Sequence, residues 1–251
     1  MRTLRQLALP LALIVLWEIL VALSGSPRAP RPSTTALKAV EMLADGTLLA
    51  ALATSLGRVF GGFVLATLLA VPLGLAMGTL PVVERNLDPL VESFRPIAAI
   101  AILPLVILWI GTGNLAAVTI VAYAAFFPIL INTIAGVKRI DRSLIRAART
   151  MGISPLTRLR TVVLPAALPS ILVGMRIGLG IAWTAIIAAE LAVGAKAGTS
   201  GGIGQMMFVF YAYSIQLSGI VVCMAAVGLV AMLLDRGLRA LLARAFPWSH
   251  P

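Results

Sequence analysis

The uncharged stretch of residues 97–137 constrains the fold more than any other feature of the sequence. A helix rises about 1.5 Å per residue and the hydrocarbon core of a bilayer is about 30 Å thick, so one helix over this stretch would be about twice as long as that core. The chain must turn inside it, and the only turn chemistry is Gly-Thr-Gly-Asn at residues 111–114. Two membrane spans are therefore expected, a short one at 97–110 and a longer one at 115–137.

The rest of the chain has the composition of a membrane protein with several spans. Hydrophobic residues make up 60% of the 251 residues and charged residues only 12%, a balance that one soluble core of this length would not need. Charge-free windows predict spans at residues 7–23, 59–80, 97–110, 115–137, 170–193 and 218–234. We expect an all-α integral membrane protein with six transmembrane helices, forming a single domain over residues 1–251. The first run could imitate a signal peptide, but its imperfect cleavage site and near-spanning length favour a retained span.

The basic residues predict the orientation of these spans. The connection 138–160 carries many Lys and Arg side chains against one acidic residue, Asp141, which places it in the cytoplasm. With six spans both termini then lie on the cytoplasmic side, where Arg2 and Arg236 are also favourable. The net charge of +11 is thus explained by membrane topology, and no nucleic-acid partner is expected.

Two rare residue types argue against catalysis and against a metal site. The sequence has one cysteine, Cys223, and one histidine, His250. An intramolecular disulfide, a multi-cysteine metal site and the usual histidine base are therefore excluded. We expect a chain that is not an enzyme, with no metal and no cofactor of its own.

The cytoplasmic loop 138–165 is predicted to contain two short helices. Asp141 is a plausible N-cap, and Gly152 stands where the first helix would end. A second helix can begin at Ser154, with Pro155 at its first position, and continue to a break at the Leu-Pro pair 164–165. The loop is thus expected to be an ordered docking surface, although arginines that only enforce topology would leave the same charge pattern.

The residues of this loop resemble the EAA signature of ABC importer permeases. The matching positions are Ala147, Ala148, Gly152, Val162, Leu164 and Pro165. Arg146 stands where the family pattern has Glu. Longer stretches, such as PLVESFRPIAAIAILPLVILWIG and LPAALPSILVGMRIGLGIAW, are similar to the permease subunits of nitrate, taurine, aliphatic sulfonate and bicarbonate importers. The resemblance covers nearly the whole chain, including the terminal PWSH.

This resemblance implies a type I importer permease fold in a bacterial inner membrane. It implies a homodimer that works with two ABC ATPase subunits and an extracytoplasmic solute-binding protein, and ATP and Mg²⁺ would be bound by the ATPase partners. The sequence itself contains no G-x-x-x-x-G-K-[ST] phosphate loop. The loop residues implied to contact the ATPase are Arg146, Ala147, Ala148, Arg149, Gly152, Val162, Leu164 and Pro165. Membrane lipid is an alternative contact for the arginines.

The resemblance further implies that the chain forms the path of a small anion: taurine, a sulfonate, nitrate or bicarbonate. One alternative is an importer of the same architecture for an aromatic or heterocyclic compound, such as a vitamin precursor or an aromatic carboxylate. A distant alternative is an ion-coupled secondary transporter, which would need intramembrane carboxylates and broken helices in two related halves.

Polar residues inside the predicted spans are candidates for the pathway, because ionisable groups at membrane depth are costly. Those that we single out are Asn132, Arg176, Trp183 and Thr184. Arg176 could instead contact carbonyls or acidic groups of a neighbouring helix, and Glu190 could bond the GAKAG loop, residues 194–198, or Lys196. Small residues at helical spacing, Gly74 with Gly78 and Gly174 with Gly178, are expected to be packing faces.

Overall fold

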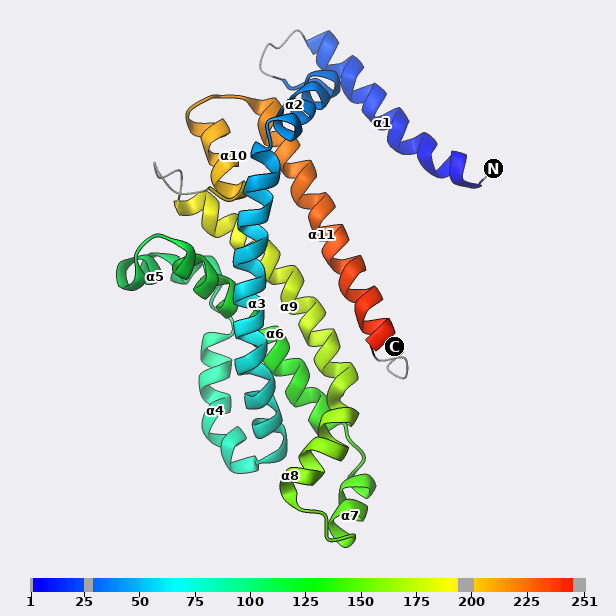
Figure 1. Ribbon diagram of the computed structural model, residues 1–251, viewed down its shortest axis with the longest axis vertical. Coiled ribbons are helices and arrows are strands. Elements are labelled where there is room, and N and C mark those ends of the chain that lie inside the picture. The colour runs from blue at the N-terminus through cyan, green and yellow to red at the C-terminus, as the bar shows by residue number, and fades with distance from the viewer. Residues whose placement is uncertain (1, 25–28, 194–200, 246–251) are drawn as a thin grey trace. The chain divides into compact units, whose positions relative to one another are not determined.

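A computed structural model describes residues 2–24, 29–193 and 201–245, which form helices joined by short connections and contain no strand (Figure 1). The helices are α1 (Arg2–Ser24), α2 (Pro32–Ala44), α3 (Thr47–Thr79), α4 (Pro81–Phe94), α5 (Leu103–Ile110), α6 (Asn114–Lys138), α7 (Arg142–Thr150), α8 (Pro155–Arg158), α9 (Leu164–Val193), α10 (Ile203–Ala212) and α11 (Leu217–Ala245). The chain forms two compact units, one of Met1–Ser55 with Glu190–Val230 and the other of Leu56–Ala189 with Ala231–Pro251.

Four of the described helices are long and apolar enough to cross a membrane. They cover Thr47–Thr79, Asn114–Lys138, Pro155–Val193 and Leu217–Ala240. A fifth candidate is the pair Pro81–Phe94 and Ala99–Ile110, which is bent by 86° at its break. The apolar part of α1, Ala12–Ser24, is shorter. All-helical architecture is confirmed, whereas the number of six spans stays a prediction.

Four of the six predicted spans fall inside these long helices. The third predicted span, 97–110, does not form a spanning helix by itself. The predicted span 97–110 corresponds to a 3₁₀ turn, Ala99–Ile102, followed by the eight-residue helix α5. Twelve residues of helix extend over only about 18–20 Å, which is too short for the hydrocarbon core. This segment therefore belongs to a broken span that begins in α4.

In the larger unit, α6 packs between α3 and α9 through close backbone contacts. A Cβ atom added to Gly74 of α3 would lie 2.7 Å from the Thr133 Cβ of α6. A Cβ atom added to Gly174 of α9 would lie 2.7 Å from the Asn132 Cβ and 3.0 Å from the Pro128 carbonyl oxygen. Only glycine permits these approaches, so the predicted packing faces are confirmed.

The smaller unit turns sharply between α2 and α3. Gly46 has φ +74°, in the left-handed region that favours glycine. The Asp45 carboxylate then accepts hydrogen bonds from the Thr47 hydroxyl at 2.7 Å and the Thr47 amide at 2.9 Å, and these bonds lower the pKa of Asp45. The start of α3 is thereby capped by a side chain, as helix N-termini require.

Candidate functional site

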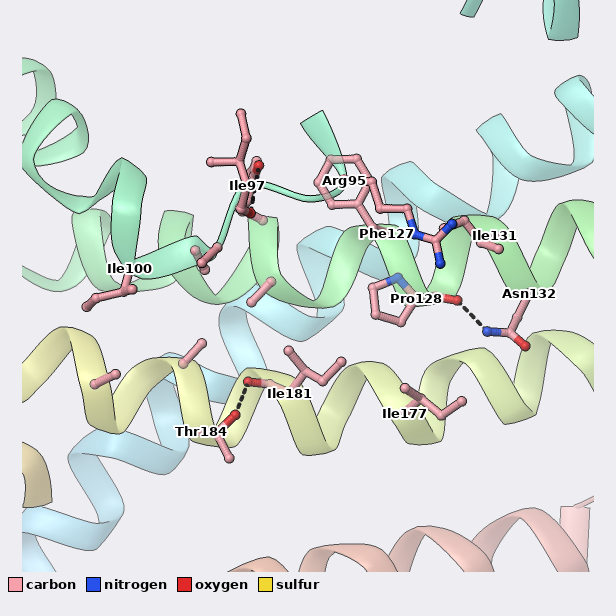
Figure 2. Close-up of a pocket in the computed structure, with 16 residues that line it drawn as sticks. Arg95, Ile97, Ile100, Phe127, Pro128, Ile131, Asn132, Ile177, Ile181 and Thr184 are labelled. Atoms are coloured by element: carbon pink, nitrogen blue, oxygen red, sulfur yellow. Dashed lines mark hydrogen bonds between the residues drawn. The ribbon is translucent and has the colours of Figure 1, made fainter. Parts of the chain in front are cut away.

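A cavity of about 680 Å³ opens in the larger unit between the break of the α4–α5 pair and helices α6 and α9 (Figure 2). Its walls are largely apolar and include Ile97, Phe127, Ile131, Ile177 and Ile181. Figure 2 shows the isoleucines of α9 facing the α6 wall. The α6 wall residues lie close to the middle of this membrane-length helix, so we expect the cavity near the middle of the bilayer.

The break that lines this cavity is held by one tyrosine. Helix α4 stops before Pro96, which has no amide hydrogen to continue it. The Tyr123 hydroxyl on α6 donates to the Phe94 carbonyl at 2.8 Å and lies 3.3 Å from the Ile97 carbonyl. Irregular backbone at membrane depth is tolerated where it faces protein or a cavity, and both conditions are met here. A broken helix lining a midplane cavity is typical of transport pathways.

The structure brings two of the four predicted pathway residues into this cavity. Asn132 of α6 and Thr184 of α9 both contribute to its lining. Trp183 is instead buried, with 2% of its surface exposed, and does not line the cavity. Arg176 pairs with Asp235 of α11, 2.6 Å between Nε and Oδ1, which is the acidic neighbour that the sequence had suggested as an alternative.

Sequence reasoning missed Arg95 and Tyr123 as cavity residues. Arg95 precedes Pro96, follows a helix with charged side chains and lies just outside the predicted span 97–110. The Arg-Pro pair at a predicted span boundary was the available signal, since proline marks the end of α4. Figure 2 shows Arg95 on the α6 side of the cavity.

The loop between α6 and α9 adopts the predicted helix, glycine turn and helix. The Asp141 carboxylate accepts from the Ser143 amide at 2.8 Å and caps α7, and this bond lowers the pKa of Asp141. Gly152 has φ +70° and ends α7. The Ser154 hydroxyl accepts from the Thr157 amide at 3.2 Å and caps α8. Local capping therefore fixes the shape of the loop.

The loop is anchored on one side and exposed on the other. Ala148 is buried, and Ile145 packs against a cluster that includes Val137 and Val163, at the lower end of the unit in Figure 1. Arg146, Ala147, Arg149, Met151 and Leu156 are exposed. The exposed face thus combines arginines with apolar side chains, a combination that suits a protein contact.

The predicted break at Leu164 and Pro165 is a change of helix type rather than an interruption. Residues Leu159–Val163 form a π-helical turn, and α9 begins at Leu164 without a gap. Pro165 cannot donate the backbone hydrogen bond that a regular α-helix would need there, and a π turn absorbs such a defect. The two residues therefore start the next span as predicted but do not end the preceding helix.

The smaller unit contains a buried polar cluster around Glu190. The Ser55 hydroxyl donates to the Glu190 carboxylate, and the Gly204 amide donates to the same carboxylate at 3.0 Å. The Ile203 amide donates to the Ser55 oxygen at 2.9 Å. The Gly204 amide at the start of α10 thus binds a carboxylate directly, as helix N-termini do, and the Ile203 amide binds it through the Ser55 hydroxyl. Both predicted partners of Glu190, the loop 194–198 and Lys196 within it, lie outside the described residues.

The described residues offer no arrangement that would hold a metal ion. No group of three or more His, Cys, Asp or Glu side chains lies together in them. The expectation about cofactors stays a prediction.

Comparisons with known proteins relate the chain to transport permeases. Residues 70–245 match the model of a family described as binding-protein-dependent transport system inner membrane component. An ABC transporter permease protein of Methanocaldococcus jannaschii is 39% identical over 97% of this chain and 91% of its own length. The taurine transport permease TauC of Escherichia coli is 41% identical over 81% of this chain and 72% of its own length. The aliphatic sulfonates permease SsuC of Bacillus subtilis is 32% identical over 97% of this chain and 87% of its own length.

A solved structure shows a similar fold. A chain of the MetNI methionine ABC transporter, in an inward-facing conformation, superposes with a TM-score of 0.59 at 24% identity. The match covers 77% of this chain and 95% of the other.

Proposed function

Since the chain belongs to the family of binding-protein-dependent transport system inner membrane components, we propose that it forms the translocation path of an ATP-driven importer for a small anion. It is a transport subunit and not itself an enzyme, as its relatives are named. ATP is bound and hydrolysed by separate ATPase subunits, and this chain converts their movement into a change of access to the path.

The observation that carries this proposal is the shape of the loop 138–165. Its inner face packs against the ends of the spanning helices through Val163 and Ile145, so a displacement of the loop would be passed to those helices. Its outer face presents Arg146, Arg149 and Met151 without burying them. A rigid, half-exposed element of this kind supports a role as the coupling helix that sits in a groove of the ATPase.

Support for an anionic cargo comes from the relatives and from the cavity. Two relatives are named for taurine and for aliphatic sulfonates, and these proteins share 41% and 32% identity with the chain. The cavity lining includes Arg95 and no acidic residue. Such a lining favours negative over positive solutes.

The proposed assembly is a homodimer of this chain with two ABC ATPase subunits and an extracytoplasmic solute-binding protein. The chain would lie in the inner membrane with both termini in the cytoplasm, since the positive-inside rule assigns the loop 138–165 to that side. Lipid headgroups would contact the remaining basic side chains.

The proposal is tested by ATP hydrolysis of the purified transporter in lipid nanodiscs. The panel contains taurine, alkanesulfonates, nitrate, bicarbonate and aromatic acids, each with and without the binding protein. We expect one class of anion to stimulate hydrolysis only when the binding protein is present. If the chain fails to purify with any ATPase, the coupling role of the loop is rejected.

Two glycines provide matched variants for the coupling step. Gly152 and Gly46 have φ of +70° and +74°, and a Cβ on either would meet no atom within 4 Å. Alanine at either site therefore brings a similar backbone strain of about 1–2 kcal/mol. We expect Gly152→Ala to reduce the stimulated hydrolysis roughly fivefold or more and Gly46→Ala to leave it unchanged. Equal losses in both variants would assign the effect to general instability.

A second candidate cargo, an aromatic carboxylate, is favoured by one feature of the cavity. Tyr123 and Phe127 form an edge-to-face pair on its wall, with ring centroids 5.2 Å apart. Exposed ring surface in such a pair can accept a further aromatic ring. The same panel distinguishes the two, because stimulation by benzoate but by no sulfonate would select the aromatic carboxylate.

A further inference from the structure

We propose that Arg95 binds the anionic head of the solute inside the cavity, and that the solute is an organic sulfonate or carboxylate with an apolar body. This inference rests on the proposed function and specifies its substrate class. It assigns a binding residue to the cavity that the broken span creates.

Among the described residues that line the cavity, Arg95 is the only charged one. In residues 29–193 and 201–245 no ion pair or hydrogen bond joins its guanidinium to another side chain, although Arg176 and Lys138 both pair with acids in the same unit. An arginine near the middle of a membrane-spanning bundle is costly unless water or an anion faces it. The position therefore marks the solute path rather than a structural ion pair.

The other polar groups of the lining are already engaged with backbone carbonyls. The Asn132 amide donates to Pro128 at 2.8 Å, and the Thr184 hydroxyl donates to Ile181 at 2.9 Å, as the dashed lines in Figure 2 show. The Tyr123 hydroxyl donates to Phe94. Arg95 is thus the main source of hydrogen-bond donors in the lining that are not already engaged with the protein. Its planar fork of N–H groups matches the paired oxygens of a sulfonate or carboxylate.

The walls of the cavity determine what kind of body the solute can carry beside its anionic head. Ile97, Ile131, Ile177 and Ile181 cannot replace the water shell of an inorganic anion. They can instead bury an alkyl or aryl group, which is favourable by about 25 cal/mol per Å² of apolar surface. A single guanidinium in an apolar cavity therefore selects a monoanion with an apolar body over nitrate or bicarbonate.

A thiol-protection experiment on the assembled transporter tests this site directly. Ile97→Cys places a reactive thiol in the cavity, and the native Cys223 is fully buried, which keeps background labelling low. The rate of maleimide labelling is measured in nanodiscs with butanesulfonate, benzoate, nitrate or bicarbonate. We expect butanesulfonate or benzoate to slow labelling about fivefold or more, and nitrate and bicarbonate to have little effect.

The role of Arg95 is isolated by adding a second substitution to Ile97→Cys. Arg95→Gln should abolish the protection, and Arg95→Lys should retain part of it because the charge remains. Arg85→Gln is the matched control, since Arg85 is an exposed arginine of α4 that does not line the cavity. Protection that survives Arg95→Gln, or that is absent with every organic anion, overturns the assignment. Equal protection by nitrate overturns the organic-solute part.

The outcome is separable from that of the proposed function. Stimulated ATP hydrolysis without any thiol protection would uphold the importer and reject the Arg95 site. Protection that depends on Arg95, together with uptake that needs no ATP, would uphold the site and reject the importer.

Discussion

The Ser55 hydroxyl and the Glu190 carboxylate form a buried contact, with Oγ 2.8 Å from Oε2, between residues 135 positions apart in the chain. Ser55 lies on α3 and Glu190 near the end of α9. The same hydroxyl oxygen accepts from the Ile203 amide at the start of α10. The Ser55 hydroxyl thus donates to a buried carboxyl group and accepts from an amide at the start of α10, so this polar cluster joins α3, α9 and α10 within the smaller unit.

Replacing Ser55 with alanine should therefore destabilise the protein. The substitution removes a donor to a buried carboxylate and an acceptor for the Ile203 amide. Such losses lower the free energy of unfolding by about 1–3 kcal/mol. Thermal unfolding in detergent measures the effect. Ser93→Ala is the control, because Ser93 is exposed and its hydroxyl bonds only the Pro89 carbonyl of its own helix. Equal stability of the two variants would contradict this role of Ser55.

Gly174→Ala should also destabilise the protein, because the new methyl group would overlap α6. It would lie 2.7 Å from the Asn132 Cβ and 3.0 Å from the Pro128 carbonyl, and overpacking of this kind costs about 1–3 kcal/mol. Gly180→Ala on the same helix meets no atom within 4 Å and should be neutral or slightly stabilising. The difference in melting temperature between the two variants is the measurement, and no difference would reject the close α6–α9 contact.

Tyr123→Phe should loosen the broken span. The Phe94 carbonyl would lose its side-chain donor, a change worth about 0.5–1.5 kcal/mol. We expect faster amide hydrogen exchange in residues 95–98, followed by mass spectrometry. Tyr211→Phe provides the comparison, since Tyr211 is exposed and lies on α10 in the other unit. Unchanged exchange at the break would show that the hydroxyl does not hold it.

The cap of α7 should be insensitive to pH across the neutral range. The pKa of Asp141 is lowered from 3.8 by its bond to the Ser143 amide, so the capping contribution is fully present above pH 3.8 and is lost as the pH falls through the lowered value. A carbon-13 NMR titration of the Asp141 carboxyl measures this pKa. Asp141→Asn keeps an acceptor oxygen and should show no such titration. A measured pKa above 3.8 would contradict the capping contact.

Sequence patterns predicted much of this fold because long apolar helices and their caps are local properties. The family resemblance is confirmed, and Asp141, Gly152 and Ser154 occupy the capping positions that their residue types predict. The loop's role in coupling stays a prediction. The π turn before Leu164 escaped prediction, because proline in a helix can be accommodated by several hydrogen-bond rearrangements that sequence does not distinguish.

The cavity could not be predicted to the same extent because it depends on tertiary packing. Asn132 and Thr184 were recognisable as polar residues within spans, but Trp183 has the same signal and is buried. Arg95 reaches the cavity only because the α4–α5 pair bends by 86°. That bend follows from contacts such as the Tyr123 hydroxyl bond, which joins residues 29 positions apart.

The most direct test of the central claim is uptake of a labelled alkanesulfonate or taurine into proteoliposomes that contain the complete transporter. We expect accumulation that requires both ATP and the solute-binding protein and that continues when ion gradients are dissipated. Accumulation that needs an ion gradient but neither ATP nor the binding protein would contradict it and favour an ion-coupled secondary transporter.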